Sequence, residues 1–480
     1  MEKVLEFIKS AYENGLSIVM LVLLILAGVF LSIRTKFFQF RKFGYVMKNT
    51  VGGLFDKSQH VKDRKSVSPF QAVTTALAGT IGTGSIAGVA TALTMGGPGA
   101  IFWMWISALF GMITKYSEIV LSLKYRETTK FGVLIGGPMY YMQNGLKKKW
   151  LAVLFSLFAM IACIGTGNAT QSNAISGVLN SSLSISPYIT GIVLTIIVAL
   201  VILGGVKRIA AINEKLVPFM AVFFILISLI TLGCNIVSVP NAFALIFKEA
   251  FNFKSAVGGV AGFGVFSAMR YGVGRGVFTN EAGLGSAPIA HAASSETNPV
   301  KQGLWGVFEV FITTIIICTM TALVVLTSDV YSGAFNLVTT EGVAMENALN
   351  GLGGAALSSA AFNEALPYVG NIGVSLATIF FSLSTILGWA YYGEVCTGYV
   401  FAKKREVAIA IYRIIYVVFT FVGAVASLDV VWLVADIFNV LMALPNLIAL
   451  IALSKVVVNL TKEHFIKKEK SEGEIESVEK

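Results

Sequence analysis

Long apolar segments constrain this chain more than any other feature, because about 20 mostly apolar residues are enough for a helix to cross a bilayer. Eleven such segments recur along the 480 residues. They cover residues 15–34, 70–95, 99–123, 151–178, 188–206, 215–238, 256–285, 303–327, 371–399, 407–427 and 431–455. Only 13% of the residues are charged, against about 25% in an ordinary soluble protein. We therefore predict an all-α polytopic membrane protein with eleven transmembrane helices.

The distribution of Lys and Arg predicts how these helices are oriented. Basic residues gather in the loops that follow the first, third, fifth and ninth spans, and in the tail after the last, whereas residues 328–370 contain none. Because basic loops stay in the cytoplasm, we expect the N-terminus outside and the C-terminus inside, in the cell membrane. The net charge of +10 then reflects loop charges. We expect the lipid bilayer as the surroundings, no nucleic-acid partner and no obligate protein partner.

The same pattern divides the chain into four parts. Residues 1–66 are predicted to form a first helix and a basic cytoplasmic loop, and residues 67–240 and 241–456 two blocks of five spans. Residues 457–480 are charged and poor in apolar residues, which predicts a disordered cytoplasmic tail. The partly apolar stretch 328–370 is expected to form short helices over one face.

The second span contains an unusual density of glycine. Gly79, Gly82, Gly84 and Gly88 alternate with Thr and Ser in its middle, and glycine is a poor helix former. Unwound backbone at mid-membrane is tolerated only where it lines a cavity or is packed in protein, so we predict an interrupted helix with a binding site. The alternative is an unbroken helix whose small residues pack against a neighbour.

The seventh span combines glycines with charges. Gly272, Gly274 and Gly276 lie beside Arg270 and Arg275, and the sequence Asn-Glu-Ala-Gly-Leu-Gly-Ser follows at 280–286. Charges at membrane depth are costly and usually mark a transport pathway or an internal pair. This predicts a second interrupted helix. The alternative is a cytoplasmic loop with solvated charges.

The two interrupted spans are five apart, so each opens a block of five. An odd number of spans per block inverts the second block, which predicts a five-plus-five inverted-repeat core with its site at the midplane. We predict a Na⁺ site made by the backbone of Gly79 and Gly82 and the hydroxyls of Ser384 and Thr385. The alternative is that the hydroxyls bond to their own helix.

Several long motifs resemble the alanine or glycine:cation symporter family, over about residues 70–450. They are GGPGAIFWMW (Gly96–Trp105), KRIAAINEKLVPFMA (Lys207–Ala221), GRGVFTNEAGLGSAPIAHAA (Gly274–Ala293), STILGWAYYGE (Ser384–Glu394) and ADIFNVLMALPNLIAL (Ala435–Leu450). The resemblance implies uptake of small neutral amino acids, mainly alanine and glycine, driven by Na⁺ or sometimes H⁺.

The resemblance also implies a set of substrate-binding residues: Thr83, Gly84, Ser85, Gln171, Tyr271, Gly274 and Trp389. Ser85 stands where the family usually has Asn, and Thr313 stands where it commonly has an acid. The first departure bears on the choice of substrate, and the second on ion coupling.

We therefore expect a secondary active importer and not an enzyme. It would carry alanine or glycine by Na⁺ symport, with alternating access around a substrate held between interrupted helices 2 and 7. Na⁺ is the expected coupling ion, and no organic cofactor is expected. H⁺ is the alternative ion, although no Asp or Glu lies in the glycine-rich part of span 2. A channel is a rival function. An intramembrane serine hydrolase using Ser286 and His291 is another, but the spacing of these residues does not fit a nucleophile elbow.

Overall fold

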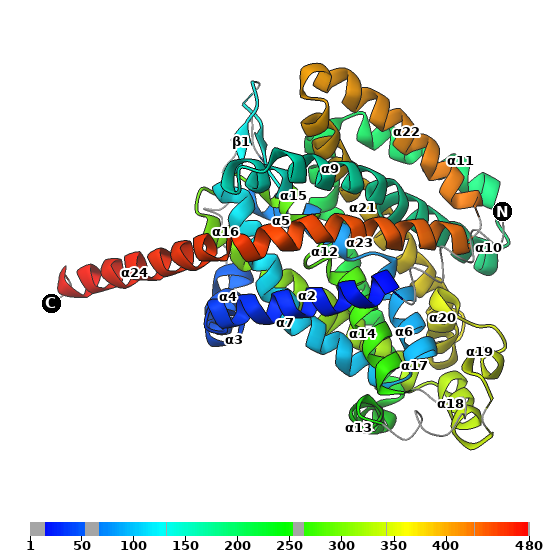
Figure 1. Ribbon diagram of the computed structural model, residues 1–480. Coiled ribbons are helices and arrows are strands. Elements are labelled where there is room, and N and C mark those ends of the chain that lie inside the picture. The colour runs from blue at the N-terminus through cyan, green and yellow to red at the C-terminus, as the bar shows by residue number, and fades with distance from the viewer. Residues whose placement is uncertain are drawn as a thin grey trace.

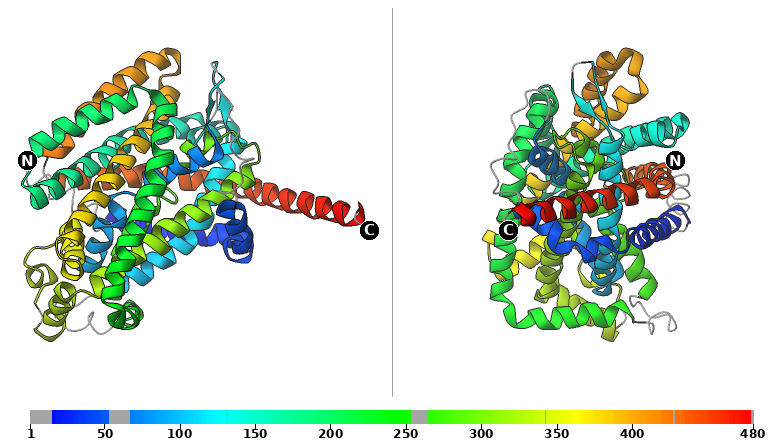
Figure 2. Two further views of the ribbon diagram at one scale, coloured as in Figure 1. Left: turned by 180° about the vertical axis from the view of Figure 1, so that it is seen from behind. Right: turned by 90° about the vertical axis from the view of Figure 1, so that its left-hand side faces the viewer.

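The computed structural model describes residues 15–52, 67–130, 132–252, 264–341, 343–426 and 428–478. The chain forms a bundle of α-helices (Figures 1 and 2). Most long helices run between two ends of the molecule. The C-terminal helix projects from one end, and the first described helix begins toward the other (Figure 1).

The described residues of the first half form helices and a short hairpin. The helices are α2 (Ser17–Arg34), α3 (Phe38–Arg41), α4 (Phe43–Thr50), α5 (Pro69–Thr80), α6 (Ala87–Gly96), α7 (Gly99–Lys124), α8 (Pro138–Tyr140), α9 (Lys149–Ile164), α10 (Thr170–Leu183), α11 (Pro187–Ile202), α12 (Gly205–Cys234) and α13 (Val239–Ala250). The strands β1 (Glu127–Thr128) and β2 (Leu134–Ile135) pair antiparallel, with Glu127 opposite Ile135.

The described residues of the second half are also mainly helical. Its helices are α14 (Val265–Asn280), α15 (Ala287–Ala292), α16 (Pro299–Val310), α17 (Thr319–Leu326), α18 (Asp329–Glu341), α19 (Met345–Ala348), α20 (Gly354–Ala365), α21 (Val369–Val400), α22 (Arg405–Val425), α23 (Leu428–Ala452) and α24 (Ser454–Val478). The whole chain also contains short 3₁₀ turns, η4 (Thr83–Ser85), η7 (Ile236–Ser238) and η10 (Ala402–Lys404), and π-helical turns, η5 (Tyr141–Gly145), η6 (Gly165–Ala169) and η9 (Phe311–Cys318).

Eight helical segments of the described residues are long and apolar enough to cross a membrane. They correspond to eight of the eleven predicted spans. The other three differ for physical reasons: α11 has only 16 residues, and the spans predicted at 70–95 and 256–285 are broken. Residues 256–263 of the latter lie outside the described residues, as do 1–14 and 53–66 of the predicted N-terminal part. The multi-pass helical fold is thus confirmed, whereas the count of eleven stays a prediction.

The second span is interrupted as its glycines predicted. Helix α5 begins at a capping box between Ser68 and Gln71, with Pro69 at its first position. It ends at Thr80, and the backbone is extended at Gly82 before the short turn η4 and helix α6. The reading of this span as one unbroken packing helix is therefore wrong.

The seventh span is also interrupted, but after the glycine triplet rather than within it. Residues 272–276 belong to the continuous helix α14. A methyl group at Gly272 would overlap the carbonyl of Ala100, so this glycine serves the close packing of α14 on α7. The break follows at 281–286, where Gly283 and Gly285 have φ of +92° and +83°. Helix α14 already ends before Glu281, which is left-handed with φ of +56°, and glycine lets the chain pass through the two further left-handed positions without strain.

Equivalent helices of the two predicted blocks pack against each other. Helix α9 packs on α21, and α11 packs on α22. The pair α11 and α22 lies side by side along one edge of the molecule (Figures 1 and 2). These pairs join the third helix of one block to the third of the other, and the fourth to the fourth, which fits a twofold relation between the predicted blocks. Helices α18, α19 and α20 form the predicted short helices of the stretch 328–370.

The expectation of a disordered tail is wrong for the residues that follow the last span. Helix α24 continues from Ser454, and its first turns are held by polar and aromatic contacts. Thr461 shares a hydrogen bond of 2.7 Å with Tyr116, and the ring of Phe465 packs on Tyr45 and Phe38. Composition alone missed this helix because a few aromatic residues are enough to dock it.

His464 makes this docking sensitive to pH. Asn298 accepts from the amides of Val300 and Lys301 through Oδ1, so its Nδ2 donates to His464 Nδ1 at 3.1 Å. The ring proton is then on Nε2, which lies 3.0 Å from the Tyr45 hydroxyl. Burial, and to a lesser degree Lys301 and Lys468, lowers the pKa of His464. Protonation removes the acceptor that Asn298 uses.

We therefore predict that α24 undocks in acid. A histidine whose pKa is lowered in the folded protein stabilises the docked helix fully above its ordinary pKa, about 6.5. This stabilisation is lost as the pH falls through the lower, folded-state pKa. Amide hydrogen exchange of residues 454–469 should accelerate between about pH 7 and about pH 5. Replacing His464 with Gln should remove this pH dependence. Equal pH dependence in both proteins would contradict the prediction.

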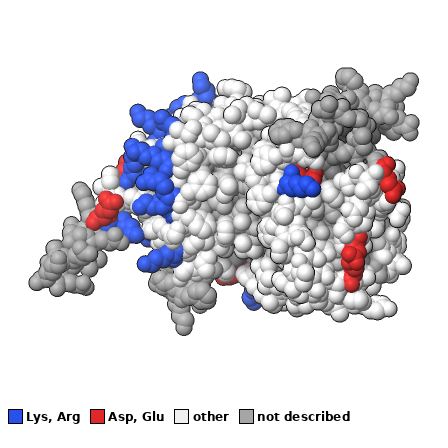
Figure 3. Space-filling model, turned by 90° about the horizontal axis from the view of Figure 1, so that it is seen from below, with Lys and Arg blue, Asp and Glu red and all other residues white. Residues whose placement is uncertain are grey.

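Basic side chains gather at one end of the molecule. Figure 3 shows Lys and Arg in a band at the end from which α24 projects, while Asp and Glu predominate at the opposite end. Helix α2 spans the two ends, since it begins at Ser17 and ends at Arg34 beside the basic residues of α3 and α4.

Candidate binding site at the two helix breaks

The break of the second span is a buried polar region. Its three residues Thr83, Gly84 and Ser85 are buried. The amide of Thr83 donates to Gln171 Oε1 at 3.2 Å, which ties the break to α10. Thr83 Oγ1 and Ser85 Oγ have no hydrogen-bond partner among the described residues, although the Cys318 thiol lies beside Ser85. Because buried hydroxyls without partners are costly, these two point to a ligand.

Helix α21 meets the same break through Thr385. Its hydroxyl oxygen lies 2.8 Å from the carbonyl oxygen of Ala78 and 2.9 Å from that of Phe381, and its single proton is shared between them. A methyl group at Gly82 would lie 2.8 Å from Thr385 Oγ1 and 3.2 Å from Gln171 Oε1, so glycine is needed for this close approach. The result is a group of backbone and hydroxyl oxygens, the donor set that unwound transporter helices offer to Na⁺.

The other predicted ion ligands have different surroundings. Ser384 Oγ bonds to the carbonyl of Phe381 in its own helix at 2.9 Å and lies 3.4 Å from Met220 Sδ on α12. The Gly79 carbonyl lies 3.4 Å from the indole nitrogen of Trp389. The carbonyl that meets Thr385 belongs to Ala78, which the sequence interpretation did not include. The type of a residue does not indicate whether its backbone carbonyl faces a site, so the Ala78 carbonyl could be identified only from the path of the backbone.

Trp389 connects the two breaks. Its indole N–H donates to Glu281 Oε1 at 2.9 Å and also lies near the Gly79 carbonyl. The other carboxylate oxygen of Glu281 accepts from Ser286. Trp389 is 1% exposed, and a methyl group at Gly167 would overlap its side chain. A bulky ring is thus fixed between the second and seventh spans. Glu281 is 2% exposed, so the reading of this segment as a solvated loop is wrong.

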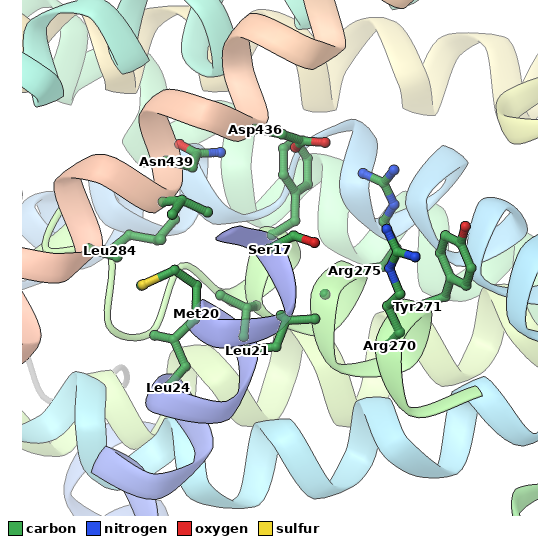
Figure 4. A pocket seen from close by; sticks show the side chains of 15 residues that line it. Ser17, Met20, Leu21, Leu24, Arg270, Tyr271, Arg275, Leu284, Asp436 and Asn439 are labelled. Carbon is green, nitrogen blue, oxygen red and sulfur yellow. The ribbon is translucent and has the colours of Figure 1, made fainter. Parts of the chain in front are cut away.

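Two further residues of α14 contact the break and were missed. A methyl group at Gly84 would lie 2.9 Å from Thr279 Oγ1 and 3.0 Å from Phe278 Cδ1. Both lie in the motif Gly274–Ala293, just before α14 ends. Tyr271 and Gly274, by contrast, line a cavity between α2, α14 and α23 (Figure 4). The structure therefore brings together Thr83, Gly84, Ser85, Gln171 and Trp389, and sets Tyr271 and Gly274 apart.

A buried ion pair supports the seventh-span break. Lys115 Nζ on α7 lies 3.1 Å from Glu309 Oε2 on α16 and donates to the Asn280 carbonyl at 2.9 Å. His291 Nε2 lies 2.6 Å from the other oxygen of Glu309. The side chains of the pair are 0% exposed. This arrangement fixes the end of α14, where the helix breaks.

The hydrogen bonds around His291 fix its tautomer. Ser294 Oγ donates to Gln302 Oε1 at 3.1 Å, so the Gln302 amide nitrogen donates to His291 Nδ1 at 2.8 Å. The proton on Nε2 therefore faces Glu309. Lys115 and Glu309 form a pair of one positive and one negative charge.

Glu118 ties the same break to two helices. Its Oε1 accepts from the amide of Gly283 at 3.1 Å and from Asn446 Nδ2 at 2.6 Å. Asn446 on α23 also donates to the Gly283 carbonyl at 2.9 Å. The left-handed turn at Gly283 is thus held between α7 and α23.

The sequence pattern that defines the sodium:alanine symporter family matches residues 1–479. The chain belongs to the sodium:alanine symporter family. It is 46% identical over 447 residues to the sodium/alanine symporter AgcS of Methanococcus maripaludis, which covers 92% of this chain and 93% of that protein. The symporter is therefore a multi-pass membrane protein of Na⁺-coupled amino acid transport and not an enzyme.

Solved structures confirm the fold of the symporter. MhsT in complex with L-phenylalanine matches with a TM-score of 0.55 and 12% identity, over 83% of this chain and 99% of that chain. A Na⁺-coupled sialic acid symporter in a substrate-bound, outward-open state matches with a TM-score of 0.52 and 12% identity, over 92% and 97%. The five-plus-five inverted-repeat core with two interrupted helices is thus confirmed.

Proposed function

We propose that the symporter imports alanine and glycine together with Na⁺, by alternating access around a substrate held between interrupted helices 2 and 7. The observation that carries this proposal is the pair of buried, unpartnered hydroxyls of Thr83 and Ser85. They lie in the break of the second span, next to the oxygens around Thr385. An amino acid supplies both donors and acceptors for such hydroxyls.

The space around the break supports a small side chain. Gly84 lies so close to Thr279 and Phe278 that even a methyl group there would be crowded. Trp389 is buried and its indole N–H donates to Glu281, so it forms a fixed wall. The substrate carboxylate is assigned to the first amides of α6, because the N-terminus of a helix favours negative charge. Gln171 positions this segment through the amide of Thr83.

The Na⁺ site is assigned to the carbonyls of Ala78 and Phe381 and the hydroxyl of Thr385, with the backbone of Gly82 beside them. Gly79 and Ser384 lie beside this site on the same two helices, but the Ser384 hydroxyl, which bonds within α21, is not assigned to the ion. The basic end of the molecule is assigned to the cytoplasm, which puts the N-terminus outside and the C-terminus inside.

The hydroxyl of Ser85 should matter for the substrate and not for folding. We predict that Ser85→Ala raises the KM for alanine about tenfold, the cost of one hydrogen bond to a charged group, at unchanged Na⁺ half-activation. Ser117→Ala is the matched control, because that hydroxyl only bonds to Ile113 in its own helix. Equal KM values for the two variants would remove Ser85 from the pocket.

Uptake of a labelled amino-acid panel into proteoliposomes tests the proposed function. With an inward Na⁺ gradient, alanine and glycine should accumulate, and bulkier amino acids should compete poorly. A pH gradient without Na⁺ should not replace the Na⁺ gradient. Preference for a large amino acid such as glutamine, or accumulation driven by H⁺ alone, would contradict the proposal.

A further inference from the structure

A cavity of about 150 Å³ lies between α2, α14 and α23 (Figure 4). This is smaller than the roughly 300–1,000 Å³ of sites for drug-sized ligands, and suits a small metabolite. Ser17, in the first turn of α2, lines it, whereas the last residue of that helix, Arg34, lies at the basic end. The cavity therefore lies toward the end opposite the basic band.

The cavity brings opposite charges to two of its sides. Arg270 and Arg275 reach it from α14, and Asp436 reaches it from α23 (Figure 4). Both arginines are half-buried in a helix that enters the bundle. Charged side chains inside a transmembrane bundle are costly and mark a site or a pathway.

An unsatisfied polar atom lies in the same cavity. Asn439 is one turn after Asp436 on α23, is 6% exposed, and lines the cavity. Its Oδ1 has no hydrogen-bond partner among the described residues. A buried acceptor without a donor costs free energy, so its retention here points to a ligand that donates a hydrogen bond.

We propose that this cavity is an outer subsite for the zwitterionic amino acid, occupied before the substrate reaches the break. The inference rests on the proposed function, because it takes the same substrate. The carboxylate pairs with the arginines of α14, which suit carboxylates through their planar donors. The ammonium donates to Asp436 and to Asn439 Oδ1. Leu21 and Ala443 provide apolar lining for a small side chain.

Phe278 separates this subsite from the break. It lines the cavity, and its Cδ1 lies 3.0 Å from the position of a methyl group at Gly84. Its ring packs on Trp432, with centroids 5.1 Å apart, and the Arg275 guanidinium lies 5.1 Å from the Trp432 ring. One aromatic side chain therefore stands between the two sites.

Asn439→Leu tests the subsite in the full-length protein. Removing an unpartnered acceptor without loss of volume should not harm folding. At saturating Na⁺, the variant should raise the KM for alanine entering from outside about tenfold, with kcat unchanged. Asn213→Leu is the matched control, because Asn213 is also a buried asparagine without a partner in the part of the chain that the structure describes, but lies on α12. Its KM should match the wild type.

Equilibrium dialysis with labelled L-alanine measures how many alanine molecules bind per chain, independently of transport. Wild type and Asn213→Leu should bind two alanines per chain, and Asn439→Leu one. Arg270→Gln should also bind one, and serves if Asn439→Leu does not fold. Unchanged KM and unchanged stoichiometry would overturn the subsite. If the proposed function itself is wrong, the result differs. The wild type then shows no Na⁺-driven uptake of alanine, while dialysis still measures whether alanine binds in the cavity.

Discussion

Lys115→Met should remove most of the folded symporter. The substitution leaves the Glu309 carboxylate buried without its cation, and breaking a buried ion pair in this way costs about 3–5 kcal/mol. It also removes the donor to the Asn280 carbonyl, at the point where α14 ends. The fraction that remains monodisperse in detergent after mild heating should fall to a small part of the wild-type value.

A double variant separates charge from packing. Lys115→Met combined with Glu309→Met replaces the pair by apolar side chains, a change that is often neutral or stabilising. It should therefore recover much of the stability that the single variant loses. His291 would keep the bond from Gln302 but lose its acceptor, so recovery should be incomplete. If the stability loss of the double variant equals the sum of the losses of the two single variants, Lys115 and Glu309 do not form an interacting ion pair.

Thr385→Ala should weaken activation by Na⁺ by about tenfold to 100-fold, the effect of losing about 1.5–3 kcal/mol of charged interaction. The Thr385 hydroxyl is the side-chain oxygen that joins α21 to the carbonyl before the first break. Initial alanine uptake measured against Na⁺ concentration gives the half-activation constant. The KM for alanine at saturating Na⁺ should change much less.

Ser384→Ala is the matched control for this prediction. Its hydroxyl bonds within α21 and lies near Met220 on α12, one residue away from Thr385 but in different surroundings. Its loss should leave the Na⁺ half-activation nearly unchanged. If both alanine variants weaken Na⁺ activation alike, the assignment of the ion oxygens to the Thr385 side of the helix is wrong.

The membrane fold and the two breaks could be predicted from the sequence because their causes are local. Apolar length identifies a span, and glycine density identifies backbone that does not hold a helix. The exact position of the break in the seventh span could not be predicted in this way. Gly272 allows α14 to pack closely on α7, whereas Gly283 allows a left-handed turn. Only tertiary packing distinguishes these two uses.

The parts that escaped prediction depend on contacts between distant segments. The Ala78 carbonyl carries no side-chain signal, and the docking of α24 depends on a few residues such as His464 and Phe465. The pairing of Lys115 with Glu309 joins residues 194 positions apart in sequence on different helices. Gln171 and Trp389, in contrast, could be assigned to the substrate site from the resemblance of their segments to the family.

Coupled flux is the most direct test of Na⁺-driven alanine import. Proteoliposomes containing the symporter are given labelled Na⁺ outside, with or without L-alanine, and the entry of both solutes is measured in parallel. The account predicts that alanine accelerates Na⁺ entry, that the two enter in a fixed ratio, and that Thr385→Ala lowers both at limiting Na⁺. Alanine entry that is independent of Na⁺, or Na⁺ entry that alanine does not change, would contradict it.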